Sequence, residues 1–219
     1  FGYGTACIGI NRSNVVLDCA GYTISAAASG MSNAIYAVNG SNSSATLYNI
    51  TIANCTVTGN FTDFGIQIRN MQKGKVIRNT VHHVYGMAGI GLFGDNTGTL
   101  VANNTAYNID HDGFQLSYGP NTLFNNTAYN NINGDGFSFS SGSNNNLTNC
   151  TAFNNSYGFY VGGESWGNRI VNSRAYNNIV DGFYIGEEGT VLIGDNSFNN
   201  ANDGYEVNGY PTGASFITI

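Results

Sequence analysis

The feature that most constrains this chain is an internal repeat. A glycine followed by an apolar, a variable and a second apolar residue recurs seven times, with spacings of 24, 24, 23, 22, 24 and 22 residues. A second apolar column runs in step with the first. Such periodicity is typical of solenoids, in which each unit buries its apolar side chains against neighbouring units. The landmark glycines are Gly65, Gly89, Gly113, Gly136, Gly158, Gly182 and Gly204.

Each repeat is expected to hold two or three short strands. Apolar residues alternate after the glycine, and Gly, Asn, Asp and Ser bound each segment. About 22 residues leave no room for a crossover helix of about a dozen residues, so each strand must pair with its equivalent in the next repeat. We therefore predict an all-β, single-domain parallel β-helix of about nine rungs, each of about 22 to 25 residues.

The domain covers residues 1–219, with atypical rungs over 1–50, regular repeats over 51–207 and an uncharged, β-prone tail over 208–219. Equivalent residues should stack in columns along the axis. The expected inner aromatic column is Phe114, Phe137, Phe159, Phe183 and Tyr205. The expected aliphatic column on another face is Ile52, Val76, Val101, Leu123, Leu147, Ile170 and Ile193. The expected asparagine ladder at a turn is Asn79, Asn104, Asn126 and Asn196.

Two segments carry a family resemblance. Residues 7–24, CIGINRSNVVLDCAGYTI, and the later NNTAxNNxxGF pattern over residues 125–161 resemble NosD-like right-handed parallel β-helix proteins, which are common among archaeal surface proteins. The resemblance implies a right-handed helix at a surface or secreted location. It does not imply one activity, because this scaffold carries lyases, hydrolases, metal-delivery proteins and inert surface proteins.

Charge and hydropathy restrict the partners. The net charge is −6 with only seven basic residues, which argues against nucleic acid. The sequence has no apolar run of about 18 residues, so no membrane span is expected. It begins at Phe1 without Met, as a processed form or a fragment would. Asn-x-Ser/Thr sequons fit an extracellular surface, and the glycosylation candidates are Asn39, Asn42 and Asn60.

The four cysteines suggest a disulfide near the N-terminus. Cys7 and Cys19 are predicted to bond and fasten the first rungs, and Cys19 with Cys55 is an alternative if they lie on adjacent rungs. Cys55 and Cys150 share a column four rungs apart, about 19 Å by rung spacing, so they cannot bond within one molecule. They are predicted to be free or bonded to another subunit.

An acidic residue precedes four of the landmark glycines: Asp112, Asp135, Asp181 and Asp203. Three hypotheses stay open. The carboxylates could accept backbone hydrogen bonds in Asp-Gly turns, hold calcium, or act as paired carboxylates in glycoside hydrolysis. The sequence predicts no required cofactor, with calcium as the possible exception, and it leaves enzyme activity open while favouring a non-enzymatic role. If the chain is an enzyme, the expected catalytic residues are Asp110, His111, Asp112 and Asp135.

Two further groups could bind ligands. The resemblance to NosD-like proteins suggests copper, although His82 and His83, adjacent on a strand, should point to opposite faces. The soft ligands are His82, His83, His111, Met31, Met71 and Met87. An outward aromatic column could stack sugars, contact a subunit, or be partly buried within the rungs. Its members are Tyr107, Tyr129, Phe153 and Tyr176.

The ends of the solenoid suggest self-assembly. The sequence shows no amphipathic capping helix, and uncovered end strands are templates for another chain. The predicted assembly residues are Phe1, Tyr3, Phe216, Ile217 and Ile219. The favoured hypothesis is an extracellular structural protein whose copies stack into a filament, sheath or surface lattice, with surface glycans as further partners. The alternatives are a secreted carbohydrate-binding or polysaccharide-cleaving module and a NosD-like copper-binding protein.

Overall fold

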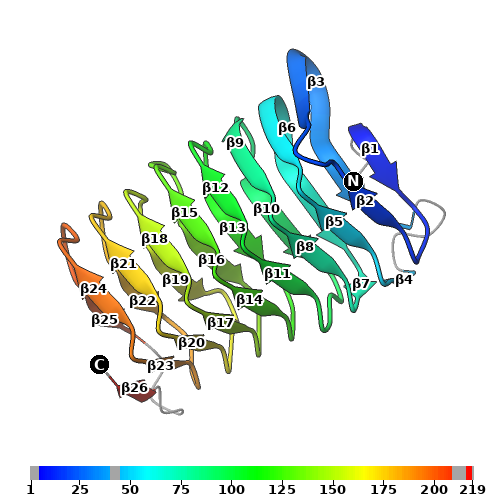
Figure 1. Cartoon of the computed structure of the whole chain (residues 1–219). Coiled ribbons are helices and arrows are strands. Elements are labelled where there is room, and N and C mark those ends of the chain that lie inside the picture. The colour runs from blue at the N-terminus through cyan, green and yellow to red at the C-terminus, as the bar shows by residue number, and fades with distance from the viewer. Residues whose placement is uncertain (1–4, 40–44, 209–215, 219) are drawn as a thin grey trace.

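The chain forms a parallel β-helix, seen in a computed structural model that describes residues 5–39, 45–208 and 216–218. Successive rungs follow one another along the axis from the N-terminal to the C-terminal end (Figure 1). The described strand pairs are parallel, and each joins one rung to the next. The second sheet holds nine strands, one per rung, which confirms the predicted fold and the expected number of rungs. Among the described residues, no helix is long and apolar enough to cross a membrane.

The first sheet has two arms that meet at β6 (Thr56–Arg69). Beside β6, the long strand β3 (Thr23–Ala37) pairs with both β6 and β1 (Ala6–Ile10). One arm runs through β10 (Ala88–Phe93), β13 (Asp112–Leu116), β16 (Phe137–Ser140), β19 (Phe159–Gly162), β22 (Phe183–Ile185) and β25 (Tyr205–Val207). The other runs through β9 (Thr80–Val84), β12 (Thr105–Tyr107), β15 (Thr127–Tyr129), β18 (Thr151–Phe153), β21 (Arg174–Tyr176) and β24 (Asn196–Phe198).

The second sheet forms another wall of the helix. It runs through β2 (Val16–Asp18), β5 (Thr51–Ala53), β8 (Lys75–Ile77), β11 (Leu100–Ala102), β14 (Thr122–Phe124), β17 (Asn146–Thr148), β20 (Arg169–Val171), β23 (Val191–Ile193) and β26 (Phe216–Thr218). A short pair, β4 (Leu47–Tyr48) and β7 (Met71–Gln72), makes a small third sheet. We call the outer surface of the β10–β25 arm the groove face and that of the β9–β24 arm the aromatic face.

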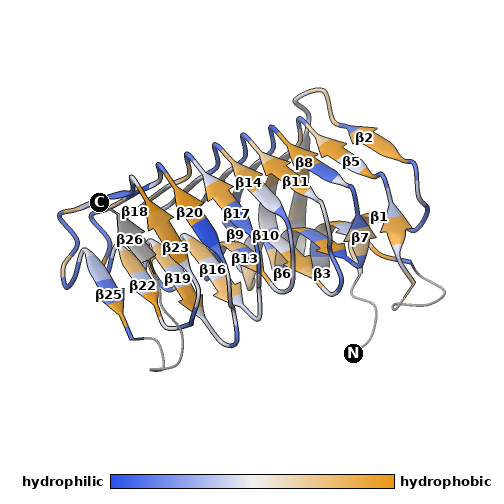
Figure 2. Ribbon diagram, turned by 90° about the horizontal axis from the view of Figure 1, so that it is seen from below, coloured by the Kyte–Doolittle hydropathy of each residue, from blue (hydrophilic) through white to orange (hydrophobic). Residues whose placement is uncertain are grey.

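The core is a set of stacked columns inside these sheets. Phe114, Phe137, Phe159, Phe183 and Tyr205 stack with centroid separations of 4.7–5.1 Å, as predicted. In Figure 2 the strands are mostly hydrophobic in colour, with some hydrophilic positions among them, and the turns are mostly hydrophilic. Each strand contributes alternate side chains to the interior, so the repeat spacing directly sets which residues are buried.

Asparagine ladders close the turns between the strands. The Asn79 backbone N–H donates to Asn104 Oδ1 at 2.9 Å, and Asn104 repeats the contact with Asn126 at 3.0 Å. The buried carboxamides thus satisfy backbone groups of neighbouring rungs. Two further ladders occupy other turns and were not predicted: Asn121, Asn145 and Asn168; and Asn131, Asn155, Asn178 and Asn200.

Two predicted columns are wrong by one residue at their last member, on β23 and next to β24. Leu192, and not Ile193, pairs with Ile170 and is buried. Asp195, and not Asn196, accepts the hydrogen bond from the Ser173 N–H at 2.6 Å. This rung is one residue shorter than the spacing assumed from the sequence, and a shift of one residue moves a side chain to the opposite face of its strand.

Candidate functional site

The groove face carries an open groove of about 830 Å³ in its N-terminal half. Phe64 and Phe93 lie edge to face across it, with centroids 5.0 Å apart. A Cβ on Gly91 would lie 2.6 Å from Phe93 and 2.8 Å from Phe64, so only glycine allows these rings to fold over the strand. The other lining residues include Tyr36, Asp63, Gln67, Arg69, Asp95, Ser117 and Ser140.

Towards the C-terminal end, tyrosines border this face. Tyr160 stacks on Tyr184 with centroids 4.9 Å apart, and Tyr157 meets Tyr160 edge to face at 5.4 Å. On the opposite side of Tyr160, the neighbour in register is Ser138. No aromatic side chain is therefore stacked in register on this side of Tyr160 among the described residues.

Two carboxyl groups lie between the groove and the tyrosines. Asp112 and Asp135 occupy consecutive rungs, and the Asp135 N–H donates to Asp112 Oδ1 at 2.9 Å. Both side chains are half-buried, and the nearby Ser138 hydroxyl lowers the pKa of each carboxyl group against the effect of burial. At the other end of the same two segments, Ser117 directly after β13 and Ser140 at the end of β16 line the groove. The structure therefore brings together two of the four residues named as catalytic candidates.

The pKa values of this pair are raised. Burial raises the pKa of Asp112 to about 6, against the hydrogen bonds from Asp135 and Ser138. Burial, and then the charge of Asp112, raises the pKa of Asp135 to about 7. Near neutral pH such a pair can hold one proton and one negative charge, as an acid and a base would require.

The other two catalytic candidates lie outside this pair. His111 and Asp110 form an exposed ion pair with Nε2 and Oδ2 3.9 Å apart. Asp110 also accepts a hydrogen bond from Asn133 at 3.2 Å. Both side chains are solvent-exposed in the turn before β13, so they do not share the half-buried environment of Asp112 and Asp135.

A second acidic cluster lies further along the same face. Asp181, Asp203 and Glu206 place one carboxylate oxygen each within 4.8 Å of one another. Asp181 is fully buried, whereas Asp203 is exposed and Glu206 half-buried. Sequence reasoning named the two aspartates as calcium candidates but missed Glu206. Glu206 lies in register with Tyr184 and close to Asp203 in the sequence, and this proximity could have predicted that it joins the aspartates.

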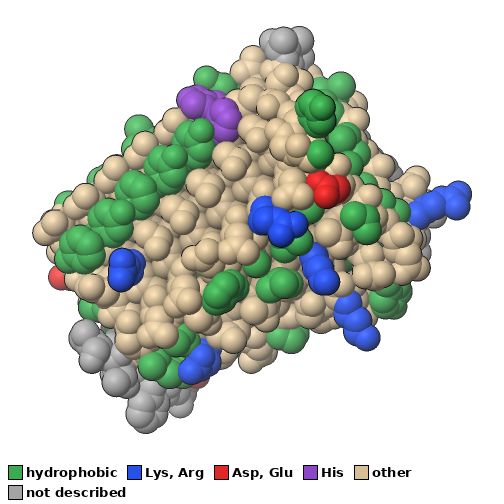
Figure 3. Space-filling model, in the orientation of Figure 1, with side chains coloured by type: hydrophobic (Ala, Val, Ile, Leu, Met, Phe, Trp, Pro, Cys, Tyr) green, Lys and Arg blue, Asp and Glu red, His purple; other side chains and the backbone are tan. Residues whose placement is uncertain are grey.

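The aromatic face carries the predicted outward column, extended at both ends. Parallel rings run from His82 through Tyr107, Tyr129, Phe153 and Tyr176 to Phe198, with centroids 4.8–4.9 Å apart. Figure 3 shows this diagonal row of hydrophobic side chains ending at histidine. Each inner ring is covered on both faces by its neighbours, so only ring edges meet solvent. The column therefore suits mutual stacking better than a sugar-stacking platform, which needs open ring faces.

The two adjacent histidines do not point apart as predicted. His83 has a positive φ of 52°, which breaks the strand alternation. Its Nδ1 lies 2.7 Å from His82 Nδ1, and its Nε2 lies 3.2 Å from the Asn108 amide. Of the other soft ligands, Met71 is fully buried in the core, while Met31 and Met87 are exposed. The buried Met71 cannot share a surface site with these imidazoles.

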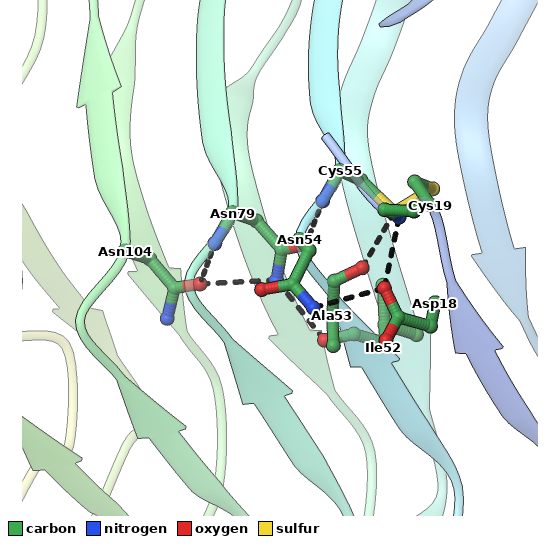
Figure 4. The surroundings of a disulfide bond; sticks show 9 residues. Asp18, Cys19, Ile52, Ala53, Asn54, Cys55, Asn79 and Asn104 are labelled. Carbon is green, nitrogen blue, oxygen red and sulfur yellow. Dashed lines mark hydrogen bonds between the residues drawn. A yellow bond between two sulfur atoms is a disulfide. The ribbon is translucent and has the colours of Figure 1, made fainter. Parts of the chain in front are cut away.

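The disulfide joins Cys19 to Cys55, so the predicted Cys7–Cys19 bridge is wrong. Cys19 follows β2 in the second sheet, and Cys55 follows β5, its partner on the next rung (Figure 4). Their Cα atoms are 4.8 Å apart. Cys7 lies in β1, on a different sheet, and is exposed and free. The prediction that Cys55 is free or intermolecular is therefore also wrong, whereas Cys150 is free and buried.

The remaining predicted residues are only partly described. Asn60 is exposed in β6 and Asn39 is half-buried, while Asn42 lies outside the described residues. Phe216 and Ile217 lie in β26, which pairs with β23 and continues the second sheet. Phe1, Tyr3 and Ile219 lie outside the described residues. Glycosylation and self-assembly stay predictions.

Comparison with known proteins places this fold in a family. The family model described as the right-handed β-helix region matches residues 6–175. The chain therefore belongs to the right-handed β-helix family. No curated protein sequence matches it significantly.

Several solved structures share the fold at low identity. Tailspike protein 2 from Escherichia coli O157:H7 bacteriophage CAB120 has a TM-score of 0.64 and 15% identity over 91% of this chain and 30% of that one. The periplasmic alginate epimerase AlgG has a TM-score of 0.53 and 17% identity over 99% and 46%. ORF18 of Geobacillus virus E2 has a TM-score of 0.54 and 14% identity over 96% and 48%. The chain thus spans less than half of each of these proteins.

Proposed function

We propose that this protein binds a polysaccharide along the groove face. The observation that carries the proposal is the continuity of this face. An open groove with an aromatic pair, the half-buried Asp112–Asp135 pair and Tyr160 follow one another along one row of strands. Carbohydrate sites combine aromatic surfaces, against which sugar rings pack, with polar groups that hydrogen-bond their hydroxyls.

The dimensions of the face suit a chain of sugars. Three rung spacings separate Gly91 from Tyr160 in register, which is about 14 Å. This length accommodates two to three monosaccharide units in an extended chain. The positions between the aromatic ends hold the polar residues Gln115 and Ser138. Ser138 is buried and Gln115 is half-buried, so of these two it is Gln115 that a linear ligand would meet in the middle.

The charge of the face favours a neutral polysaccharide. Arg69 is the cation that lines the groove, whereas Asp63 and Asp95 line it as carboxylates. The whole chain carries a net charge of −6. These negative charges would repel a polyuronate, which is itself an anion, but would neither attract nor repel a neutral polysaccharide.

The comparisons support a role in this class and outside the cytoplasm. Two similar structures are a periplasmic alginate epimerase and a phage tailspike, which share this fold. The Cys19–Cys55 disulfide fits an oxidising compartment such as the periplasm or the extracellular space. The copper hypothesis gains no comparable support, because Met71 lies in the core. The self-assembly hypothesis stays a prediction, since β26 pairs with β23 on one side and has no described neighbour on the other.

The binding proposal is tested by affinity electrophoresis in gels that contain neutral polysaccharides (xylan, galactomannan, mixed-linkage glucan), with polygalacturonate as the charged counterpart. We expect retardation by at least one neutral polymer and a loss of affinity of at least tenfold in Phe93→Ala and in Arg69→Ala. The matched controls are Phe124→Ala and Arg169→Ala, exposed residues on the second sheet. No retardation by any polymer, or equal losses in the controls, would refute the proposal.

A second candidate function is cleavage of the bound chain by Asp112 and Asp135. Their positions on adjacent rungs, about 4.8 Å apart, approach the carboxyl separation of about 5 to 5.5 Å in retaining glycosidases. The raised pKa of Asp135, due to burial and the charge of Asp112, would let it donate a proton to the leaving oxygen near neutral pH. The Asp112 carboxylate would then be the nucleophile.

Reducing-end release from the bound polysaccharide tests this second function. Asp112→Asn and Asp135→Asn should each reduce the rate by at least a hundredfold without weakening retardation in the gel. Asp110→Asn serves as the control, because this exposed carboxylate lies outside the pair. If wild-type protein binds but releases no reducing ends, the protein is a binding module and the cleavage hypothesis is wrong.

A further inference from the structure

The C-terminal acidic cluster contains a buried carboxylate whose charge is not matched by any described cation. Asp181 is fully buried, and its Oδ1 accepts hydrogen bonds from the Asp203 N–H and from Asn202 Nδ2, both at 2.9 Å. Its second oxygen, Oδ2, is buried without a hydrogen-bond partner. An unpaired buried carboxylate oxygen is costly unless a cation or a proton meets it.

Two other carboxylates converge on the same point. The side chain of Glu206 contacts that of Asp181, and Asp203 completes the set within 4.8 Å. Among the described residues the only ion pair is His111 with Asp110, so no described Lys or Arg neutralises the cluster. Three converging carboxylates without a basic partner repel one another, and this repulsion is relieved by a bound cation.

We propose that Asp181, Asp203 and Glu206 bind one calcium ion that fastens the last rung of the groove face to the rung before it. Asp181 immediately precedes β22, while Asp203 and Glu206 belong to the next rung with β25. A shared ion would therefore join the two rungs through side chains, in addition to the backbone ladder. The site is distinct from the proposed polysaccharide groove and does not depend on it.

Ligand chemistry favours calcium over magnesium at this cluster. The three carboxylate oxygens lie within 4.8 Å of one another, so one ion can reach all of them. Calcium binds carboxylate oxygens at about 2.3–2.6 Å in flexible geometry, whereas magnesium requires a stricter octahedron with bonds of about 2.0–2.1 Å. Calcium also accepts bidentate carboxylates and waters, which three ligands from two rungs would need.

Neighbouring groups hold the ligands in position. Asn202 and the Asp203 N–H orient Asp181 through Oδ1, which leaves Oδ2 for the ion. The Asn208 amide donates to Glu206 Oε1. Such supporting hydrogen bonds are typical of metal sites, because they reduce the freedom that each ligand loses on binding. Asp203 is exposed, so the ion can reach the cluster from solvent.

Isothermal titration of the chelator-treated full chain with calcium chloride, and separately with magnesium chloride, tests the site. We expect one calcium per chain and at least tenfold weaker binding of magnesium. Asp203→Asn and Glu206→Gln should each weaken calcium binding by at least tenfold, and both residues are accessible enough to leave the fold intact. Asp110→Asn, an exposed carboxylate elsewhere, should bind as the wild type does.

Either of two results would overturn the proposed calcium site. The first is no heat of binding at calcium concentrations up to about 10-fold above the millimolar level of extracellular fluids. The second is calcium binding that neither cluster variant weakens. Asp181→Asn is a third variant, read together with its far-ultraviolet spectrum because the residue is buried. Polysaccharide retardation of the same variants separates this proposal from the groove: loss of calcium binding with normal retardation confirms two independent sites.

Discussion

The Asp112–Asp135 pair and the Asp181–Asp203–Glu206 cluster come from the same position of the repeat but differ in their surroundings. In both, an aspartate precedes the landmark glycine on consecutive rungs. In the first pair the neighbouring row contributes Ser138, whose hydroxyl lowers the pKa of both carboxyl groups. In the second it contributes Glu206, a third carboxylate. Tyr157 occupies the aspartate position between them.

This comparison indicates that aspartates at the same position of the repeat can differ in their ionisation and ligand preference, depending on the side chain that the neighbouring column places beside them. In the first pair, burial raises the pKa of both carboxyl groups, and the charge of Asp112 raises that of Asp135 further, so the pair can hold a proton near neutral pH. With a third carboxylate and a fully buried member, one proton is insufficient, and a divalent cation compensates better. The following experiments test that distinction.

The largest expected effect is the stabilisation by calcium at the three-carboxylate cluster. At a calcium concentration 100 times the Kd, the free energy of unfolding of the wild type should rise by about 2.7 kcal/mol. Asp181→Asn should lose this gain, whereas Asp112→Asn should keep it. Chemical denaturation with and without calcium measures both. A gain that depends on Asp112 and not on Asp181 would reverse the assignment.

The next effect is the pH dependence that the first pair contributes. The native carboxyls have pKa values of about 6 and about 7, above the ordinary value of 3.8. Between about pH 4 and pH 7 the native state therefore binds more protons than the unfolded state, so the free energy of unfolding falls as pH rises. After allowance for partial solvation, we expect a fall of about 1 to 2 kcal/mol from this pair.

Asp135→Asn isolates that contribution. The variant should lose most of this fall and be more stable than the wild type at pH 8, because it removes a charge that burial and Asp112 disfavour. Asp195 also has a pKa raised by burial to about 6, so the quantity to compare is the difference between variant and wild type. Urea denaturation at several pH values gives it. Equal pH profiles for the two proteins would contradict the shared-proton interpretation.

The smallest effect concerns Ser138. Its hydroxyl lowers the pKa of both carboxyls against the effect of burial. Ser138→Ala should therefore raise both pKa values by less than about one unit. Carbon-detected NMR titration of the aspartate carboxyls measures the change. Ser117→Ala, whose hydroxyl faces Ser140 instead, should leave both values unchanged.

Much of the fold could be predicted from the sequence because a solenoid is a local pattern repeated. The alternation after each landmark glycine specifies which side chains enter the core, and equal spacing specifies which stack. The inner phenylalanine column and the ladder from Asn79 to Asn126 follow from this arithmetic alone. The prediction from equal spacing is wrong by one residue where a rung is shorter, as at Leu192 and Asp195.

The candidate sites depended on contacts between rungs that spacing does not reveal. His83 joins His82 because a positive φ ends the strand alternation, and Cys19 meets Cys55 because the long segment between them returns to the same sheet. Glu206 joins the aspartates because side chains from two rows lean together. The sequence by itself determined the parallel β-helix and its columns, since these follow from periodic burial. Only the tertiary structure decided which neighbours form the disulfide, the carboxyl pair and the three-carboxylate cluster, because these depend on side-chain direction and burial across rungs.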